Sequence, residues 1–264
     1  MATGEVPKRL WLIGGTSESA QIAEAIAPLK LPCTITVTTA AATALYPQIE
    51  FFQIIVGQID PYNLDTFFQQ QQIGAVLDAS HPHAVAVSQG AMASAARWEI
   101  PYLRYERPSL SLETQAGSVI ALESFDALLA GNYLHQQRVL LTVGCKPLPQ
   151  FQSWQDHATL FARTLPTANS IEVALSAGFT SDRIIALRPP ISAELEKALW
   201  HHWQISLVVT KASGKAGGEE VKQAAAAELG IPLIVITRPS ITYPQQTSDL
   251  SEVLAFCRQH ILLS

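Results

Sequence analysis

Short apolar runs rich in β-branched residues alternate with helix-like segments along the whole chain of 264 residues. Such runs are typical of buried strands, and parallel strands need a long connection, usually a helix, between them. The sequence therefore predicts an α/β fold with parallel sheets flanked by helices. The expected strands are residues 10–13, 33–37, 51–56, 75–77, 102–105, 119–122, 139–143, 160–163, 184–187, 207–210 and 233–237.

Helical patterns fill most of the segments between these runs. Asp60 is expected to cap one helix with Pro61 as its first residue, and Pro82 is expected to start another, because proline suits the first helical position. The expected helices are residues 17–27, 60–72, 82–98, 124–135, 171–177, 192–203, 218–229 and 249–260. The change of pattern near residues 110–137 divides the chain into residues 1–115 and 116–264.

The two halves share short matching segments in the same order. Short matches of this kind can arise by coincidence, but their similar spacing favours two related Rossmann-like lobes. Ligands bind at the carboxyl ends of parallel strands, so related lobes are expected to share a cleft at those ends. The matches pair residues 13–15 with 143–145, 79–80 with 212–213, 96–101 with 227–232, and 107–109 with 238–240.

The first strand runs into two glycines and a hydroxyl-rich helix start, in the order Gly14, Gly15, Thr16, Ser17, Glu18. Glycine lets the backbone approach a phosphate closely, and the N-terminus of a helix attracts an anion. Thr16 or Ser17 is expected to cap the helix. The spacing differs from the dinucleotide pattern G-x-G-x-x-G, so a tight turn without a ligand is an equal alternative.

Polar residues follow the strand at residues 75–77. Asp78, Ser80 and His81 lie where such folds hold ligands, and Pro82 follows them. Helix capping is the alternative explanation for Asp78 and Ser80, although capping does not explain the histidine. No G-x-S-x-G elbow is present, which argues against a Ser-His-Asp hydrolase.

Residues 210–218, Thr-Lys-Ala-Ser-Gly-Lys-Ala-Gly-Gly, follow a strand in the second half. Lysines and flexible glycines before a helix suit a phosphate or a carboxylate. The order is not that of a Walker A loop, and a solvated surface loop is the alternative. Arg107, Arg163, Arg188 and Arg238 at expected strand ends would add positive charge for a polycarboxylate, unless each pairs with an acid.

Charge and cysteine content exclude several classes of protein. A net charge of −5 and a pI near 5.8 argue against a nucleic-acid binder. Three cysteines without a C-x-x-C pair favour neither a disulfide framework nor a metal site, and adjacent His201 and His202 diverge on a helix. No apolar run approaches the ~18 residues of a membrane span, and no signal peptide is apparent, so a cytoplasmic protein without membrane contact is expected.

Taken in order, these segments resemble the precorrin-6A reductase family of cobalamin biosynthesis. The similarity extends from Gly14 to Arg238 and rests on residues 14–18, residues 78–82, the strand from Ile100 to Arg107-Pro108, and residues 209–214. The resemblance implies a two-lobed Rossmann-like reductase. Such an enzyme would transfer hydride from NADPH or NADH to a carbon–carbon double bond of precorrin-6A or cobalt-precorrin-6A, a polycarboxylate tetrapyrrole.

The resemblance also implies roles for individual residues. Residues 1–115 would bind the dinucleotide and residues 116–264 the tetrapyrrole, and contact with other enzymes of corrin synthesis is compatible with the family. Lys211 would stabilise electron density on the ring and His81 would donate a proton. The dinucleotide would be bound by Gly14, Gly15, Thr16, Ser17, Glu18, Asp78, Ala79 and Ser80, and the substrate by Arg107, Ser213, Gly214 and Arg238.

Some positions depart from the family pattern. His83 stands where an aromatic residue often follows His-Pro in the family. The family often has Lys-Asn-Ser-Gly-Gly, and here Ala212 replaces the asparagine and Lys215 replaces the last glycine. Residues 36–42 contain neither an acid for a ribose hydroxyl nor an arginine for a 2′-phosphate, so NADPH and NADH both remain open. A transferase using a nucleotide-sugar or S-adenosylmethionine, and a non-catalytic nucleotide sensor, are the alternative functions.

Overall fold

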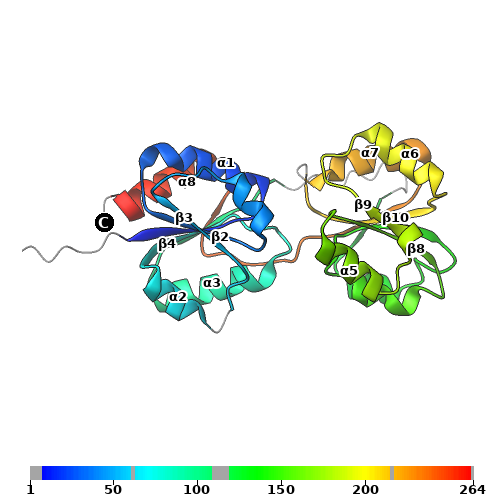
Figure 1. Cartoon of the computed structure of the whole chain (residues 1–264), viewed down its shortest axis with the longest axis horizontal. Coiled ribbons are helices and arrows are strands. Elements are labelled where there is room, and N and C mark those ends of the chain that lie inside the picture. Colours follow the sequence, from blue (N-terminus) through cyan, green and yellow to red (C-terminus); the bar gives the residue numbers. More distant parts are fainter. Residues whose placement is uncertain (1–7, 61–62, 109–118, 215–216, 263–264) are drawn as a thin grey trace, which may run out of the picture. The chain divides into compact units, whose positions relative to one another are not determined.

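The computed structural model describes residues 8–60, 63–108, 119–214 and 217–262. The chain forms two units, one made of residues 1–108 and 240–264 and the other of residues 109–239. Each unit contains a six-stranded sheet in which the paired strands run parallel. The predicted α/β fold with two Rossmann-like lobes is confirmed (Figure 1).

The first unit has the strand order β12-β5-β4-β1-β2-β3. Helices α1 and α8 cover one face of the sheet, and α2 and α3 cover the other (Figure 1). The strands are β1 (Arg9–Ile13), β2 (Cys33–Val37), β3 (Phe52–Val56), β4 (Ile73–Asp78), β5 (Tyr102–Tyr105) and β12 (Gln246–Thr247). The helices are α1 (Ser17–Ile26), α2 (Leu64–Gln70), α3 (Val85–Arg97) and α8 (Leu250–Cys257), with 3₁₀ helices at Ala27–Leu29 and Ala40–Leu45 and a π-helix at Arg258–Leu262.

The second unit has the strand order β6-β11-β10-β7-β8-β9. Helices α6 and α7 cover one face of its sheet, and α4 and α5 pack on the other. The strands are β6 (Val119–Leu122), β7 (Arg138–Thr142), β8 (Thr159–Thr164), β9 (Ile184–Ala186), β10 (Leu207–Lys211) and β11 (Leu233–Ile236). The helices are α4 (Phe125–Ala130), α5 (Ala168–Ser176), α6 (Ala193–His202) and α7 (Glu219–Leu229), with 3₁₀ turns at Leu148–Trp154 and Ser181–Arg183.

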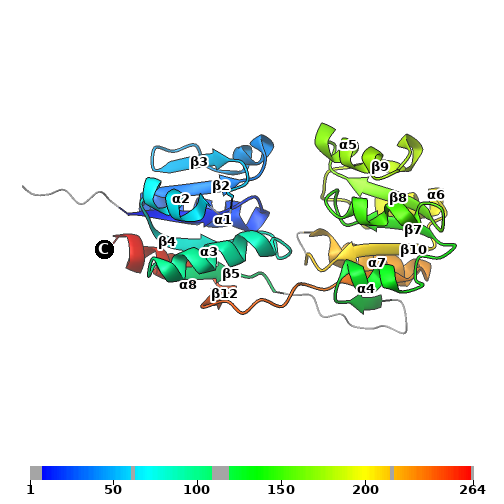
Figure 2. The ribbon, with the colours of Figure 1, turned by 90° about the horizontal axis from the view of Figure 1, so that it is seen from below.

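The sixth strand of each sheet is exchanged between the two units. In the first unit, the edge strand β12 pairs with β5, although it comes after all the strands of the second unit in the sequence (Figure 2). In the second unit, the edge strand β6 pairs with β11, although it comes directly after β5 of the first unit in the sequence. The structure therefore places residues 240–264 with the first unit, whereas the sequence analysis assigned them to the second. That assignment followed chain order, and the polar pair Gln246–Thr247 gives no strand pattern of its own.

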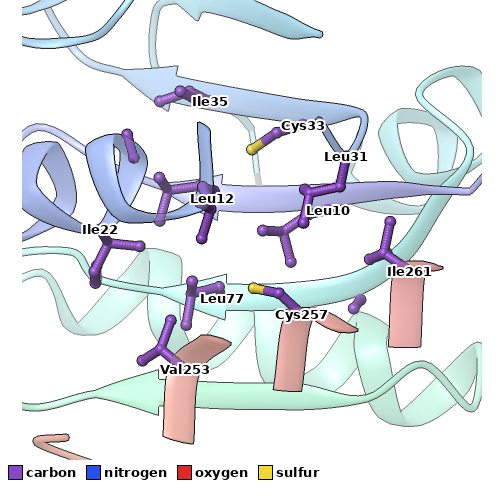
Figure 3. Packing of buried hydrophobic residues seen from close by; sticks show 14 of the residues in the cluster. Leu10, Leu12, Ile22, Leu31, Cys33, Ile35, Leu77, Val253, Cys257 and Ile261 are labelled. Carbon is purple, nitrogen blue, oxygen red and sulfur yellow. The ribbon is translucent and has the colours of Figure 1, made fainter. Parts of the chain in front are cut away.

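Helix α8 ties the returning segment to the first core. Its Val253 lies beside Leu77 and its Cys257 lies beside Leu10, both residues of central strands, as Figure 3 shows. All four side chains are completely buried. Burying apolar surface stabilises by about 25 cal/mol per Å², so this packing holds the end of the chain in the first unit.

Two helices begin later than the prolines predict. The amide of Ala84 donates to the carbonyl of His81 (2.7 Å), closing a turn, and α3 therefore starts at Val85. The preceding helix α2 starts at Leu64, and Pro61 lies outside the described residues. None of the helices in the described ranges is long and apolar enough to cross a membrane.

Alkaline pH is expected to weaken the first core through its two thiols. Burial raises the pKa of Cys33 above its ordinary range and that of Cys257 to about 12, whereas both are near 9 in the unfolded chain. At pH 10 the unfolded chain therefore releases protons that the folded chain keeps, which lowers the free energy of unfolding by about 1.4 kcal/mol per thiol.

Urea unfolding at pH 7.5 and pH 10 checks this expectation. The Cys33→Ala/Cys257→Ala double variant should lose about 3 kcal/mol less on going to pH 10 than the wild type does. Equal losses in both proteins would contradict it.

Candidate functional site

Two turns meet at the carboxyl edge of the first sheet, one after β1 and one after β4. These strands are neighbours, with Ile13 opposite Asp78. Thr16 caps α1, since its Oγ1 accepts from the amide of Ser19 (3.0 Å), and the same Oγ1 donates to the carbonyl of Ala79 (2.8 Å). The threonine thus fastens the predicted phosphate turn to the turn after β4.

Gly15 gives this edge its open space. Its φ is +94°, which favours glycine, and a Cβ built there would meet no atom within 4 Å. Beyond it, the first amides of α1, those of Ser17 and Glu18, lie at the positive end of the helix. An open glycine turn at a helix N-terminus fits the pyrophosphate of a dinucleotide.

Tyr46 shapes the same turn and was missed from the sequence. Its hydroxyl accepts from the amide of Gly15 (2.6 Å) and shares a hydrogen bond with Ser19 Oγ (2.7 Å). The side chain is buried, and a Cβ on Gly14 would collide with the hydroxyl. Tyr46 follows the alanine-rich turn after β2, where no motif marks it.

Asp78 is a completely buried carboxylate with four protein donors. Oδ1 accepts from the amide of Ser80 (2.9 Å) and from Arg104 Nη1 (2.9 Å). Oδ2 accepts from the hydroxyls of Ser88 (2.5 Å) and Tyr102 (2.6 Å). Asp78 was predicted to bind the cofactor, but here it holds the end of β4 and the Ser80 turn in place.

Arg104 is the buried partner of Asp78, and it was also missed. Its Nη1 donates to Ser80 Oγ (3.0 Å), and its Nη2 lies 2.8 Å from Glu106. Burial opposes its charge, but the carboxylates of Asp78 and Glu106 outweigh that effect and raise the pKa of Arg104. Arg104 therefore stays charged and holds Ser80 through one direct hydrogen bond and, indirectly, through Asp78.

The Asp78→Asn variant is expected to destabilise the protein by about 3–5 kcal/mol, because it removes the completely buried partner of Arg104 and leaves only the more exposed Glu106 to balance the buried charge. Urea unfolding measures the loss. The control is Asp65→Asn, which breaks the exposed pair between Asp65 and Arg97 and should lower the free energy of unfolding far less. Similar losses in the two variants would contradict the assigned role of Asp78.

His81 lies half-buried on the turn after β4. Its Nδ1 accepts from the amide of His83 (3.2 Å), which leaves the proton of the neutral ring on Nε2. The ring of His83 lies 5.7 Å from it. In its neutral form His81 is thus held in the tautomer whose Nε2–H is a hydrogen-bond donor.

Arg107 forms an ion pair with Glu18 within the first unit. Its Nη1 lies 2.6 Å from Glu18 Oε1, and both side chains are largely buried. Together with Ser80 and Pro82 they line a pocket of about 10 Å³, room for about one water molecule. The structure brings these two predicted site residues together, and each neutralises the charge of the other.

The second sheet carries a positive carboxyl edge. β7 and β10 are neighbours, with Thr142 opposite Thr210, so the turn after β7 lies beside Lys211. Burial, and then the nearby ammonium of Lys146, lowers the pKa of Lys211. Two lysines at one sheet edge suit a ligand with several carboxylates.

Ser213 and Gly214 continue this edge but face partly inward. Ser213 is buried, and its amide donates to the carbonyl of Lys211 (2.7 Å). The amide of Gly214 donates to Glu219 Oε2 (2.7 Å). Lys215 lies outside the described residues.

The other predicted arginines take different places. Arg163 donates to both carboxylate oxygens of Glu196 (2.6 Å each), which is the acid pairing that the sequence analysis gave as the alternative to a role at a ligand cleft. Arg238 donates to the carbonyl of Ala212 (3.1 Å), beside Lys211, and Arg188 is exposed. Pairing with acids explains Arg163 and Arg107.

Comparison with known proteins gives a consistent result. Residues 9–258 match the model of the family described as precorrin-6x reductase CbiJ/CobK. The chain is 46% identical to the cobalt-precorrin-6A reductase of Synechocystis sp., over 96% of this chain and 97% of the relative. It is 31% identical to that of Priestia megaterium, over 92% and 95%. A solved structure of CobK precorrin-6A reductase has the same fold, with a TM-score of 0.79, 24% identity and coverage of 96% and 97%.

Proposed function

Because the chain belongs to the precorrin-6x reductase family CbiJ/CobK, we propose that it reduces cobalt-precorrin-6A with hydride from NADPH. The protein is an oxidoreductase of cobalamin biosynthesis that acts on a carbon–carbon double bond and uses a nicotinamide cofactor. The relatives at 46% and 31% identity are both cobalt-precorrin-6A reductases, which favours the cobalt-bearing substrate. The transferase and sensor alternatives find no support in this family.

The first unit supplies the dinucleotide site in this proposal. The open space at Gly15 and the start of α1 carry the assignment, since they fit a pyrophosphate. When bound, the reduced nicotinamide supplies the hydride. In this proposal the dinucleotide is bound by Gly14, Gly15, Thr16 and Ser17. Asp78 and Arg104 hold Ala79 and Ser80 at the end of the neighbouring strand.

The second unit supplies charge for the substrate. Lys211 and Lys146 attract its carboxylates, and Arg238 of the same unit is a further candidate for such a contact. Negative charge that develops on the ring during reduction is stabilised by a positioned cation. Lys211 is the candidate because it ends β10 at this edge and is half-buried, where a charge interacts more strongly than in water.

Reduction of a double bond also requires a proton at the neighbouring carbon. His81 holds its proton on Nε2, because Nδ1 accepts from His83. A histidine exchanges protons near neutral pH, which suits a general acid. In the proposal His81 takes up a second proton from solvent, and the resulting imidazolium gives one proton to the carbon and returns to the neutral ring.

Anaerobic assays with purified substrates test the function. The enzyme is incubated with cobalt-precorrin-6A or metal-free precorrin-6A, each with NADPH or NADH, and loss of the reduced cofactor is followed by absorbance. We expect the highest kcat/KM with the cobalt form and NADPH. No oxidation of either cofactor with either substrate would contradict the proposed function.

A further inference from the structure

Four charged side chains are buried together in the second unit. Glu219 and Lys222 lie on α7, Glu196 lies on α6, and Arg163 lies on β8. Arg163 is 11% exposed and the other three are 2% exposed. Arg163 and Glu196 form an ion pair, and the charge of Lys222 interacts with those of the other three.

Such burial needs a reason other than stability. Taking charges out of water is costly, and well-packed apolar side chains in their place are often no less stable. Lys222 is costly for a second reason, because a cation near the N-terminus of a helix opposes the helix dipole. Burial, and then the charge of Arg163, lowers the pKa of Lys222 to about 8.

The bonds of Glu219 and Lys222 point to the loop after β10. Glu219 Oε2 accepts from the amide of Gly214 (2.7 Å), and the amide of Glu219 donates to the carbonyl of Gly214 (3.3 Å). Lys222 Nζ donates to the carbonyls of Gly217 (2.7 Å) and Gly218 (2.9 Å). Two buried charges thus hold the two described ends of this loop.

The loop itself needs such support. Gly218 precedes α7 with a φ of +65° and provides no side-chain cap. The side chain of Ser213 packs so closely on Gly217 that a Cβ on Gly217 would collide with the Oγ of Ser213. The same segment begins at Lys211, whose carbonyl accepts from the amide of Ser213.

We propose that Glu219 and Lys222 are positioning residues, which hold Ser213, Gly214 and the Gly217–Gly218 turn so that Lys211 faces the substrate. This inference rests on the proposed role of Lys211. It assigns a function to two buried residues that make no contact with the ligand.

The double variant Glu219→Gln/Lys222→Met tests the inference, because it removes one charge of each sign and leaves the Arg163–Glu196 pair intact. We expect kcat/KM for cobalt-precorrin-6A to fall about tenfold or more, mainly through KM, with the Kd of NADPH unchanged. The single variant Glu219→Gln keeps an acceptor oxygen for Gly214 and should stay within about threefold of the wild type.

The matched control is Lys197→Met/Glu228→Gln, which removes an exposed pair of the same residue types in the same unit. This control variant should leave kcat and KM for cobalt-precorrin-6A and the Kd of NADPH unchanged. Unchanged substrate KM in a folded Glu219→Gln/Lys222→Met variant would overturn the inference, and so would an equal loss of NADPH affinity.

Two further measurements keep the outcomes separate. If the double variant does not fold, Gly218→Ala strains the same turn at its positive φ and should give the same rise in substrate KM; a normal KM in that variant would overturn the inference. If Lys211→Ala is fully active, the proposed role of Lys211 fails and this inference fails with it, whereas the proposed reductase activity stands.

Discussion

Replacing Lys211 by alanine is expected to lower kcat/KM for cobalt-precorrin-6A by about 100-fold, or about 2.7 kcal/mol of transition-state stabilisation. The ammonium group ends β10 and is partly shielded from water, so its loss removes a positioned cation. Steady-state kinetics at several substrate concentrations measures the effect. We expect kcat to fall and KM to rise, because the cation attracts the carboxylates of the bound substrate and the negative charge that develops on the reacting ring.

The comparison variants are two other lysines of the second unit. Lys146→Ala should cause a smaller loss, because this lysine neighbours Lys211 but is exposed. Lys197→Ala, which removes a surface partner of Glu228, should leave kinetics unchanged. Full activity of Lys211→Ala would remove Lys211 from the site.

Gly15→Ala is expected to raise the Kd of NADPH at least tenfold, equivalent to about 1.4 kcal/mol. The new methyl group would project into the open space beside the turn, where the pyrophosphate is proposed to approach. Alanine at a φ of +94° also costs about 1–2 kcal/mol, which should leave the fold intact. Fluorescence titration with NADPH measures the Kd, and thermal unfolding checks the fold.

Gly144→Ala is the matched control, because Gly144 follows β7 as Gly15 follows β1. Its φ is +76°, and a Cβ there also meets open space, so the backbone cost is similar. NADPH affinity should be normal in this variant. A normal Kd in Gly15→Ala, or a raised Kd in Gly144→Ala, would contradict a dinucleotide site on the first unit.

Strand positions and the internal repeat could be read from the sequence because buried parallel strands are continuous apolar runs. The matching segments around Gly14 and Gly144 do follow equivalent strands, and the strand order of the two sheets is equivalent throughout. The exchange of the sixth strands could not be read in the same way. Pairing of Gln246–Thr247 with β5 is a tertiary contact that depends on the packing of α8 and not on a local pattern.

The sequence predicted where the site residues lie better than it predicted which groups their side chains contact. Residues 14–18 and 78–81 do meet at one sheet edge, as neighbouring strands require. Sequence alone could not tell that Asp78 and Arg163 turn inward, because a charged residue at a strand end looks the same whether it meets a buried partner or solvent. Arg104 and Glu196 supply those partners from other elements, and Tyr46 likewise reaches the Gly15 turn from another element. No spacing rule connects these residues to their partners.

The central claim is that the first unit binds the dinucleotide and the second unit binds the tetrapyrrole. Hydrogen–deuterium exchange with each ligand added separately tests this claim most directly. NADPH alone should slow amide exchange at residues 14–19 and 78–81, and cobalt-precorrin-6A alone should slow it at residues 143–146 and 211–214. Protection of residues 143–146 and 211–214 by NADPH, with none at residues 14–19, would contradict the account.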